Sequence, residues 1–217
     1  MSRTSRCLAV VAAVAACLAS AVPAAAATYL AQSTFGTGAD GWRLTSTLGY
    51  DGPVSWSNTG GNPGGFIYGQ DPDTGAFGFL APAKFRGPVA AALHHELYFD
   101  VAAYQQPDGP TSWVGMRGTN GLELVCSYAS PAAPMTWYRR TVWMDATGGW
   151  TVVGTGLPAS DAQILSVLQN LAGLAICAEF VEGFPNDISG LDNVTLVPEP
   201  ATLALVGLGA LALWRRR

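Results

Sequence analysis

Alternating apolar and polar positions dominate the middle of the chain and predict β-strands. In Leu97–Ala102, leucine, phenylalanine and valine alternate with tyrosine, aspartate and alanine, the pattern of a strand with one buried and one hydrated face. Other short segments rich in Trp, Tyr, Phe, Val and Thr lie between turn signals. We expect nine strands: Gly65–Gln70, Ala76–Leu80, Leu93–Ala103, Ser112–Arg117, Leu122–Tyr128, Met135–Met144, Trp150–Val153, Leu174–Phe180 and Leu191–Val197.

One segment has helical periodicity. Ser160–Gln163 reads as a capping box, in which serine and glutamine side chains bond the first amides of a helix. Ile164–Leu171 then carries apolar residues at helical spacing. Single glycines and prolines separate the remaining segments, and neither an internal repeat nor a long linker is visible. The sequence therefore predicts an all-β fold, an antiparallel jelly-roll β-sandwich with one short helix.

The first 27 residues have the three parts of a secretory signal peptide. Met1–Arg6 carries two arginines, Cys7–Val22 is small and apolar, and Ala24–Ala27 offers an Ala-x-Ala cleavage site. Val14–Cys17 loosely matches a lipoprotein box, which would leave a lipidated Cys17. The apolar stretch continues beyond this cysteine to the Ala-x-Ala site, which favours simple cleavage and export.

The last 20 residues form a second signal. Pro198, Glu199 and Pro200 precede the uncharged segment Ala201–Trp214, and three arginines end the chain. This segment is expected to be a short transmembrane helix whose arginine end is cytoplasmic. The arrangement resembles the PEP-CTERM sorting signal of Gram-negative bacteria. The resemblance implies processing by an exosortase, transient residence in the inner membrane, and release to the cell surface or extracellular matrix. A permanent tail anchor is the alternative.

Removing both ends changes the charge of the chain. The whole chain has a net charge of −4, but five of its 11 Lys and Arg lie in the terminal segments. Residues 28–197 keep six Lys and Arg against 14 Asp and Glu, a net charge of −8. Such a domain lacks the basic surface that nucleic-acid binding requires. The domain also stays sparsely charged and rich in glycine and aromatic residues, a composition that suits neutral sugar polymers.

Two cysteines lie outside the signal peptide. Cys126 and Cys177 both fall in predicted strands of an exported chain, which predicts one inter-strand disulfide. Two buried free thiols are the alternative. A zinc site is not expected, because two cysteines without a nearby histidine do not complete a tetrahedral shell.

A second resemblance covers Phe35–Leu196. Five motifs occur in order along this segment: Phe35 with Gly41-Trp42, then Gly60–Gly65, Asp71, Phe79–Gly87 and Gly190–Val194. This succession is similar to the laminin B (laminin domain IV) module. The resemblance implies a β-sandwich related to carbohydrate-binding modules. Tyr104–Pro134 has no counterpart in the motifs.

Related sandwiches often hold a structural calcium ion between the first and last strands, which makes Asp40 and Asp192 candidate ligands. Alternatively, Asp192 and Asn193 bond only turn amides. A second acidic segment, Asp71–Gly75, has the Asp-x-Asp-x-Gly spacing of calcium loops but lacks their distal glutamate, which favours a hairpin turn between two strands. His94–Glu96 cannot converge on one metal from a strand, so we expect solvated strand positions there.

No nucleophile elbow, Cys/His pair or phosphate loop is present, and no enzymatic activity is expected. Tryptophan is abundant instead. On one face of the segment 135–144, Trp137, Arg139 and Trp143 could lay a glycan along a sheet, and Trp113 is a further candidate. Trp42 is expected in the core.

These features predict an exported, non-enzymatic matrix or biofilm protein that binds or organises extracellular polysaccharide. Aromatic side chains and polar loops would make the contacts, and exosortase would be the sorting partner. One alternative is a structural or protein-interacting surface protein without a glycan site. A third possibility is a lyase or glycosidase, which would need two carboxylates in a cleft.

Overall fold

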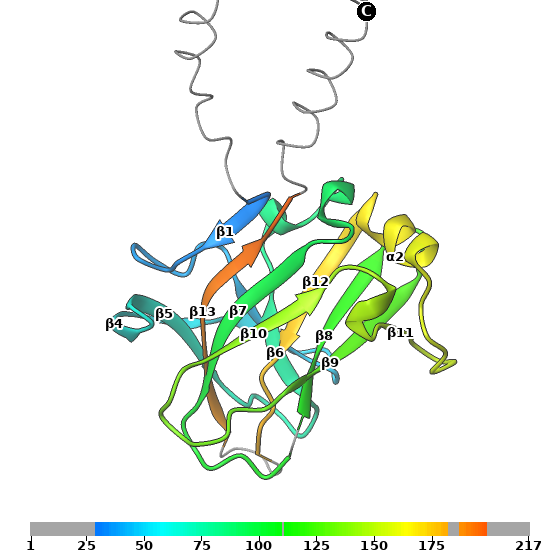
Figure 1. Cartoon of the computed structure of the whole chain (residues 1–217). Coiled ribbons are helices and arrows are strands. Elements are labelled where there is room, and N and C mark those ends of the chain that lie inside the picture. Colours follow the sequence, from blue (N-terminus) through cyan, green and yellow to red (C-terminus); the bar gives the residue numbers. More distant parts are fainter. Residues whose placement is uncertain (1–28, 110, 182–186, 199–217) are drawn as a thin grey trace, which may run out of the picture. The chain divides into compact units, whose positions relative to one another are not determined.

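The computed structural model describes residues 29–109, 111–181 and 187–198 (Figure 1). The predicted signal peptide and the segment from Glu199 onward lie outside these ranges. Within the part of the chain that is described, no helix is long and apolar enough to cross a bilayer.

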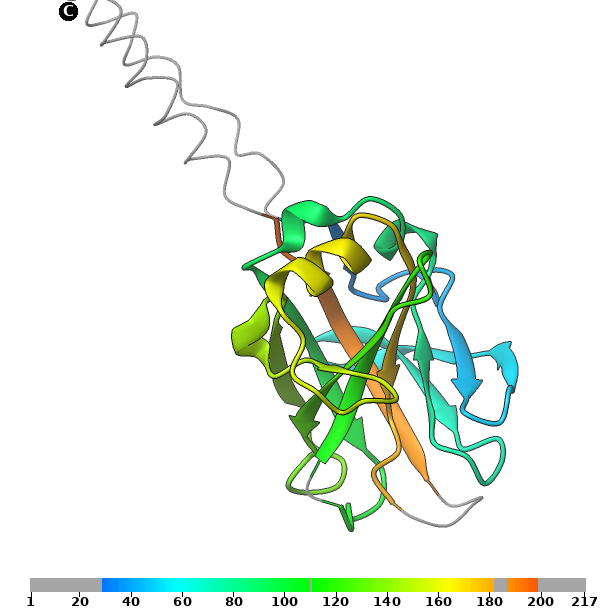
Figure 2. The same ribbon diagram turned by 90° about the vertical axis from the view of Figure 1, so that its right-hand side faces the viewer.

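Two antiparallel sheets form the fold, and Figure 2 shows the layers after a quarter turn. Sheet A has the order β10 (Tyr138–Trp143), β7 (Glu96–Ala103), β13 (Ile188–Leu196), β5 (Gly64–Gln70) and β4 (Ser55–Gly61), and β1 (Ala31–Ser33) also pairs with β13. Sheet B has the order β11 (Thr151–Val152), β9 (Glu123–Ala129), β8 (Thr111–Gly118), β12 (Leu171–Cys177), β6 (Phe77–Leu80), β2 (Arg43–Ser46) and β3 (Asp51–Pro53). This arrangement confirms the predicted antiparallel β-sandwich.

The predicted alternation directs side chains to the two faces of each sheet. In β7, Leu97, Phe99 and Val101 are fully buried between the sheets, and every second residue points to the outer face of sheet A. In β8, Val114 and Met116 are buried in the same core. The space between the sheets is filled by aromatic and aliphatic side chains from both, which stabilises the sandwich by removing apolar area from water.

The helix forms as its sequence predicts. Helix α2 spans Asp161–Leu168, and its N-cap Ser160 and Gln163 make the reciprocal capping-box bonds. Ile164, Val167 and Leu168 point into the core. The helix packs against β8 and the 3₁₀ turn Ala90–Ala92, at one end of the sandwich (Figure 2). Two further 3₁₀ turns span Ala83–Phe85 and Ala146–Gly148.

All nine predicted strands overlap observed ones, and four observed strands, β1 to β4, were not predicted. Trp42 is in the core as expected, with its ring edge-on to Phe35 and Phe85 and its Nε1 donating to Ser33 Oγ.

Two local predictions were wrong. Asp71–Gly75 is not a hairpin turn, because β5 and β6 belong to different sheets. His94 has φ = 62° and precedes β7, which begins at Glu96, so it occupies a turn rather than a strand.

Candidate functional site

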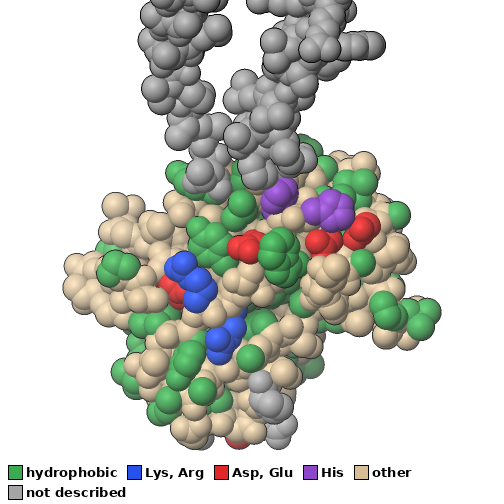
Figure 3. All heavy atoms as spheres, viewed as in Figure 1, with side chains coloured by type: hydrophobic (Ala, Val, Ile, Leu, Met, Phe, Trp, Pro, Cys, Tyr) green, Lys and Arg blue, Asp and Glu red, His purple; other side chains and the backbone are tan. Residues whose placement is uncertain are grey.

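The predicted glycan face lies on β10, at the edge of sheet A. Arg139, Thr141 and Trp143 pair across to Asp100, Tyr98 and Glu96 of β7 and share the outer face. Figure 3 shows the side of the molecule on which sheet A lies, where hydrophobic, cationic and acidic side chains are interspersed. The alternation inferred from the sequence therefore places these side chains on one face.

Trp137, however, is packed into the fold. Its indole Nε1 donates to the carbonyl of Gly60 at 2.9 Å, and its ring meets Phe66 edge-to-face at 5.3 Å. A Cβ on Gly190 would lie 2.9 Å from the ring, so the indole rests directly on the backbone of β13. Residues of three strands therefore contact the Trp137 indole, which the sequence analysis had proposed for stacking on a glycan.

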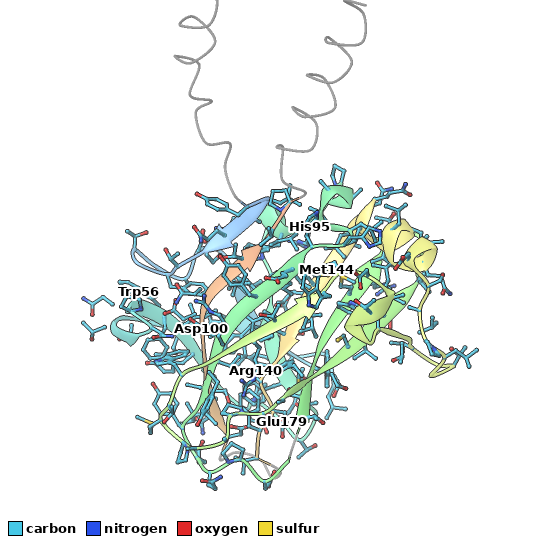
Figure 4. The ribbon with its side chains drawn as sticks, in the orientation of Figure 1. Trp56, His95, Asp100, Arg140, Met144 and Glu179 are labelled. Atoms are coloured by element: carbon cyan, nitrogen blue, oxygen red, sulfur yellow. The ribbon has the colours of Figure 1, made fainter. Side chains whose placement is uncertain are left out.

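Arg139 is also engaged. Its guanidinium donates to both carboxylate oxygens of Asp100, at 2.9 and 3.2 Å, and stacks over the Tyr98 ring at 5.0 Å. Asp100 is fully buried in the middle of sheet A (Figure 4), so the arginine neutralises a buried charge. Trp143 is 44% exposed, but six residues of strand place it roughly 20 Å from Trp137. The outer face of β10 thus leaves one accessible indole.

The predicted calcium ligands, Asp40 and Asp192, have different hydrogen-bond partners. Asp192 lies opposite Asp100 and accepts the backbone amides of Asn62 and Asn193, both at 2.7 Å. Burial raises the pKa of Asp192 to about 6, although the two hydrogen bonds favour the charged carboxylate and lower it. Asp40 instead contacts Lys84 and accepts from the Ser33 hydroxyl.

Among the described residues, no group of three or more His, Cys, Asp and Glu is arranged to hold a metal. The partners of Asp192 are N–H donors and those of Asp40 are an ammonium group and a hydroxyl donor, whereas Ca²⁺ is held by several oxygens around one point. Each of the two carboxylates is thus engaged by donors of its own.

The predicted disulfide is wrong. Cys126 and Cys177 are both buried and free. Cys126 of β9 pairs with Val114 of β8, which pairs with Ile176 of β12. The cysteines are therefore two strands apart, about 10 Å, and on opposite faces of sheet B, beyond the reach of an S–S bond. Cys126 Sγ donates to the carbonyl of Gly148, and burial raises the pKa of this thiol to about 11.

The outer face of sheet B carries a groove of about 970 Å³. Its floor is made by small residues on neighbouring strands, Gly115 of β8 and Gly173 and Ala175 of β12. A Cβ at Gly173 would meet no atom within 4 Å, so space is open above the floor. The groove arises because outward positions that could carry large side chains carry glycine and alanine instead.

Trp113 lies in this groove. The alternation of β8 turns Val114 and Met116 inward and leaves Trp113, Gly115 and Arg117 outward. A Cβ on Gly115 would lie 3.0 Å from the Trp113 ring, so the indole extends over the glycine. The glycine thereby lets a half-buried aromatic ring lie against the sheet instead of standing away from it.

Polar and charged side chains form the rim. Thr45 and Thr47 at β2 and Arg86 after η1 (Ala83–Phe85) line one side. Glu123 lines the other, 3.4 Å from Arg117. A flat aromatic surface with a few polar groups around a concave space is the usual construction of a small-molecule or carbohydrate site.

Sequence reasoning selected Trp113 but missed its surroundings. Gly115 was visible as a small residue between Trp113 and Arg117 on the outward face of a predicted strand, whereas Gly173 lay just before the predicted strand Leu174–Phe180 that contains Ala175. That pattern signals a depression on an outer face. The alignment of β8 with β12 depends on strand order, which the sequence does not reveal.

The two sheets and their strand order define the class of protein, an antiparallel β-sandwich with ligand-sized space on one outer face. The Laminin B (Domain IV) family model matches residues 78–200, more than half of the chain, and the chain belongs to this family. The PEP-CTERM protein-sorting motif matches residues 196–217, which confirms the sorting signal. The motif marks the protein for export and surface sorting in Gram-negative bacteria and implies an exosortase as its sorting partner.

A solved laminin domain has the same fold. The L4b domain of human laminin alpha-2 superposes with a TM-score of 0.62 at 13% identity, over 79% of this chain and 98% of that domain. The family 11 carbohydrate-binding module of a Clostridium thermocellum cellulase gives a TM-score of 0.49 at 15% identity, over 78% of this chain and 96% of the module. No curated protein matches the sequence.

Proposed function

We propose that this protein is an exported, non-enzymatic surface or matrix protein that binds polysaccharide in the groove on sheet B. The observation that carries the proposal is the indole of Trp113, which extends over Gly115 in a groove of about 970 Å³. An aromatic face of this kind can stack on the C–H face of a sugar ring, while the rim hydroxyls, guanidinium groups and Glu123 can bond sugar hydroxyls.

The charges of the groove support binding rather than hydrolysis. Glycoside hydrolysis uses two carboxyl groups, about 5–9 Å apart, that flank the scissile bond. Glu123 is the one carboxylate among the described residues that line the groove, and it is exposed and faces Arg117. The groove therefore offers contacts for a sugar chain without the second acid of a glycosidase.

The test is an affinity measurement with the purified full chain against a panel of neutral and acidic polysaccharides, by gel retardation and calorimetry. Trp113→Ala is expected to weaken binding at least tenfold. Trp143→Ala removes an exposed indole from sheet A and is the matched control, with no change in affinity expected. Loss with Trp143→Ala but not with Trp113→Ala would move the site to sheet A. No binding by the parent protein would favour the structural or protein-interacting alternative.

A further inference from the structure

The lining of the groove is more basic than the rest of the domain. Residues 28–197 carry a net charge of −8. The described lining of the groove, however, contains two arginines, Arg86 and Arg117, and only one carboxylate, Glu123. A local reversal of charge at a concave surface attracts anions even when the whole domain is acidic. The reversal matters only if the arginines are free to bind a ligand.

Arg86 is free in this sense. The described residues contain six Lys and Arg, and four of them are ion-paired, Arg43, Lys84, Arg117 and Arg139. Arg140 donates to the backbone carbonyls of Ala129 and Ser130. Arg86 is exposed, and within the described part of the chain its guanidinium is the cation that contacts no carboxylate or carbonyl.

The two arginines flank the same point of the groove floor. Gly87 and Gly118 both pair with Leu171, from opposite sides of β12. The residues that precede them, Arg86 and Arg117, therefore start on either side of β12 beside Gly173, roughly 10 Å apart. The space above Gly173 is open, so both guanidinium groups can reach one anionic group there.

Arg117 is held only weakly by its acid. Its Nε lies 3.4 Å from Glu123 Oε1, and the side chains of Arg117 and Glu123 are 65% and 46% exposed. Such a pair contributes little to stability and can rearrange when a ligand supplies another carboxylate. Arginine suits this exchange, because its planar guanidinium can bond a carboxylate or sulfate with two parallel hydrogen bonds.

We infer that the groove selects acidic polysaccharides. The carboxylate or sulfate of a sugar residue would lie above Gly173 between Arg86 and Arg117, while a neighbouring sugar ring stacks on Trp113. This inference rests on the proposed function, since it assigns the ligand class of the same groove. Charge complementarity favours an acidic chain over a neutral chain of the same shape.

The experiment compares each polymer with its own neutral form. Polygalacturonate and alginate are used as free acids and as methyl esters, with the purified full chain, at low and high salt. The free acid is expected to bind at least tenfold more tightly than the ester at low salt, and the difference should shrink as salt screens the charges.

Three substitutions test the residues. Arg86→Gln and Arg117→Gln should each weaken binding of the acid about tenfold or more, without changing binding of the ester. Glu123→Gln should tighten binding of the acid, because it removes the carboxylate that opposes the ligand. Arg43→Gln removes an arginine of sheet B outside the groove lining and is the matched control, with unchanged affinity.

The outcomes separate the two proposals. Equal binding of acid and ester, unaffected by the arginine substitutions but lost in Trp113→Ala, would overturn the acidic selectivity and leave the glycan groove standing. Weaker binding of the acid in Glu123→Gln would also overturn the selectivity. No binding of any polymer, or binding that survives Trp113→Ala, would overturn both.

Discussion

The indole of Trp113 extends over Gly115, at a separation where a methyl group on the glycine would come within 3.0 Å of the ring. The two residues alternate with buried Val114 on β8, so both face the groove. Without a side chain at position 115, the ring can lie against the sheet and present its other face to a ligand.

Filling the groove floor should weaken binding without changing the tryptophan. Gly173 has open space above it and lacks the positive φ that would exclude a side chain, so Gly173→Leu fits the fold. We expect at least tenfold weaker polysaccharide binding. The free energy of unfolding should change by less than about 0.5 kcal/mol, as for most surface substitutions.

Calorimetry and urea denaturation measure both quantities. Thr141→Leu adds the same side chain to the exposed outer face of sheet A and should leave affinity unchanged. Full affinity in Gly173→Leu would show that the ligand does not lie over this part of sheet B.

Of the two tryptophans of the predicted glycan face, Trp137 should contribute to the free energy of unfolding and Trp143 should contribute little. Trp137 packs against Phe66 and Gly190 and bonds Gly60. Trp137→Ala should therefore lower the free energy of unfolding by about 2 kcal/mol, less than for a fully buried tryptophan. Trp143→Ala should change it by under about 0.5 kcal/mol. Urea denaturation of both variants gives the comparison, and equal losses would contradict these contacts.

Sequence periodicity determined most of the fold because the buried strands alternate cleanly. Leu97, Phe99 and Val101 point inward in the structure as the pattern required. The unpredicted β4 has mostly exposed Ser, Asn, Thr and Gly positions. Such a strand forms because it pairs with β5, a tertiary contact that leaves no hydrophobic pattern in the sequence.

The candidate site was only partly accessible to the same reasoning. Alternation placed Arg139 and Trp143 on one outer face of β10, as their pairing with β7 shows, but it could not show that Asp100 engages Arg139 or that Gly190 lies under Trp137, which precedes β10. The cysteine pairing failed for a related reason. Mid-strand location made Cys126 and Cys177 plausible partners, whereas the insertion of β8 between β9 and β12 separates them.

Reduction should therefore leave the protein as stable as before. A disulfide closing this loop of about 50 residues would contribute about 4 kcal/mol, or roughly 10 °C in melting temperature. We expect no shift in melting temperature with reductant. In denaturant, thiol titration should find two thiols more than in the Cys126→Ala/Cys177→Ala variant, which corrects for cysteines of the signal peptide. A lower melting temperature on reduction would restore the disulfide.

Three carboxyl groups near one end of the sandwich, Asp71, Glu179 and Asp187, should make the domain less stable as pH rises. Burial first, and then the charge of Asp71, raise the pKa of Glu179 to about 7, against a hydrogen bond from the Phe77 amide that lowers it. Burial also raises the pKa values of Asp71 and Asp187. Figure 4 shows Glu179 well apart from Asp100.

The sign follows from proton binding. Between the ordinary glutamate pKa and about 7, the folded state holds a proton on Glu179 that the unfolded state has lost. The free energy of unfolding therefore falls as pH rises through this window and levels off above it. Because Glu179 is partly exposed, we expect a fall of about 1–2 kcal/mol rather than the full value implied by the pKa difference.

Glu179→Gln should make this dependence clearly smaller and be more stable than the parent at pH 8, because a neutral amide replaces a partly buried charge, while Asp192, with a pKa of about 6, keeps part of the slope. Urea midpoints at pH 5 and pH 8 measure the effect. Glu123→Gln, at an exposed glutamate of the groove rim, is the control and should keep the slope of the parent. A parent protein that gains stability between pH 5 and pH 8 would contradict the raised pKa of Glu179.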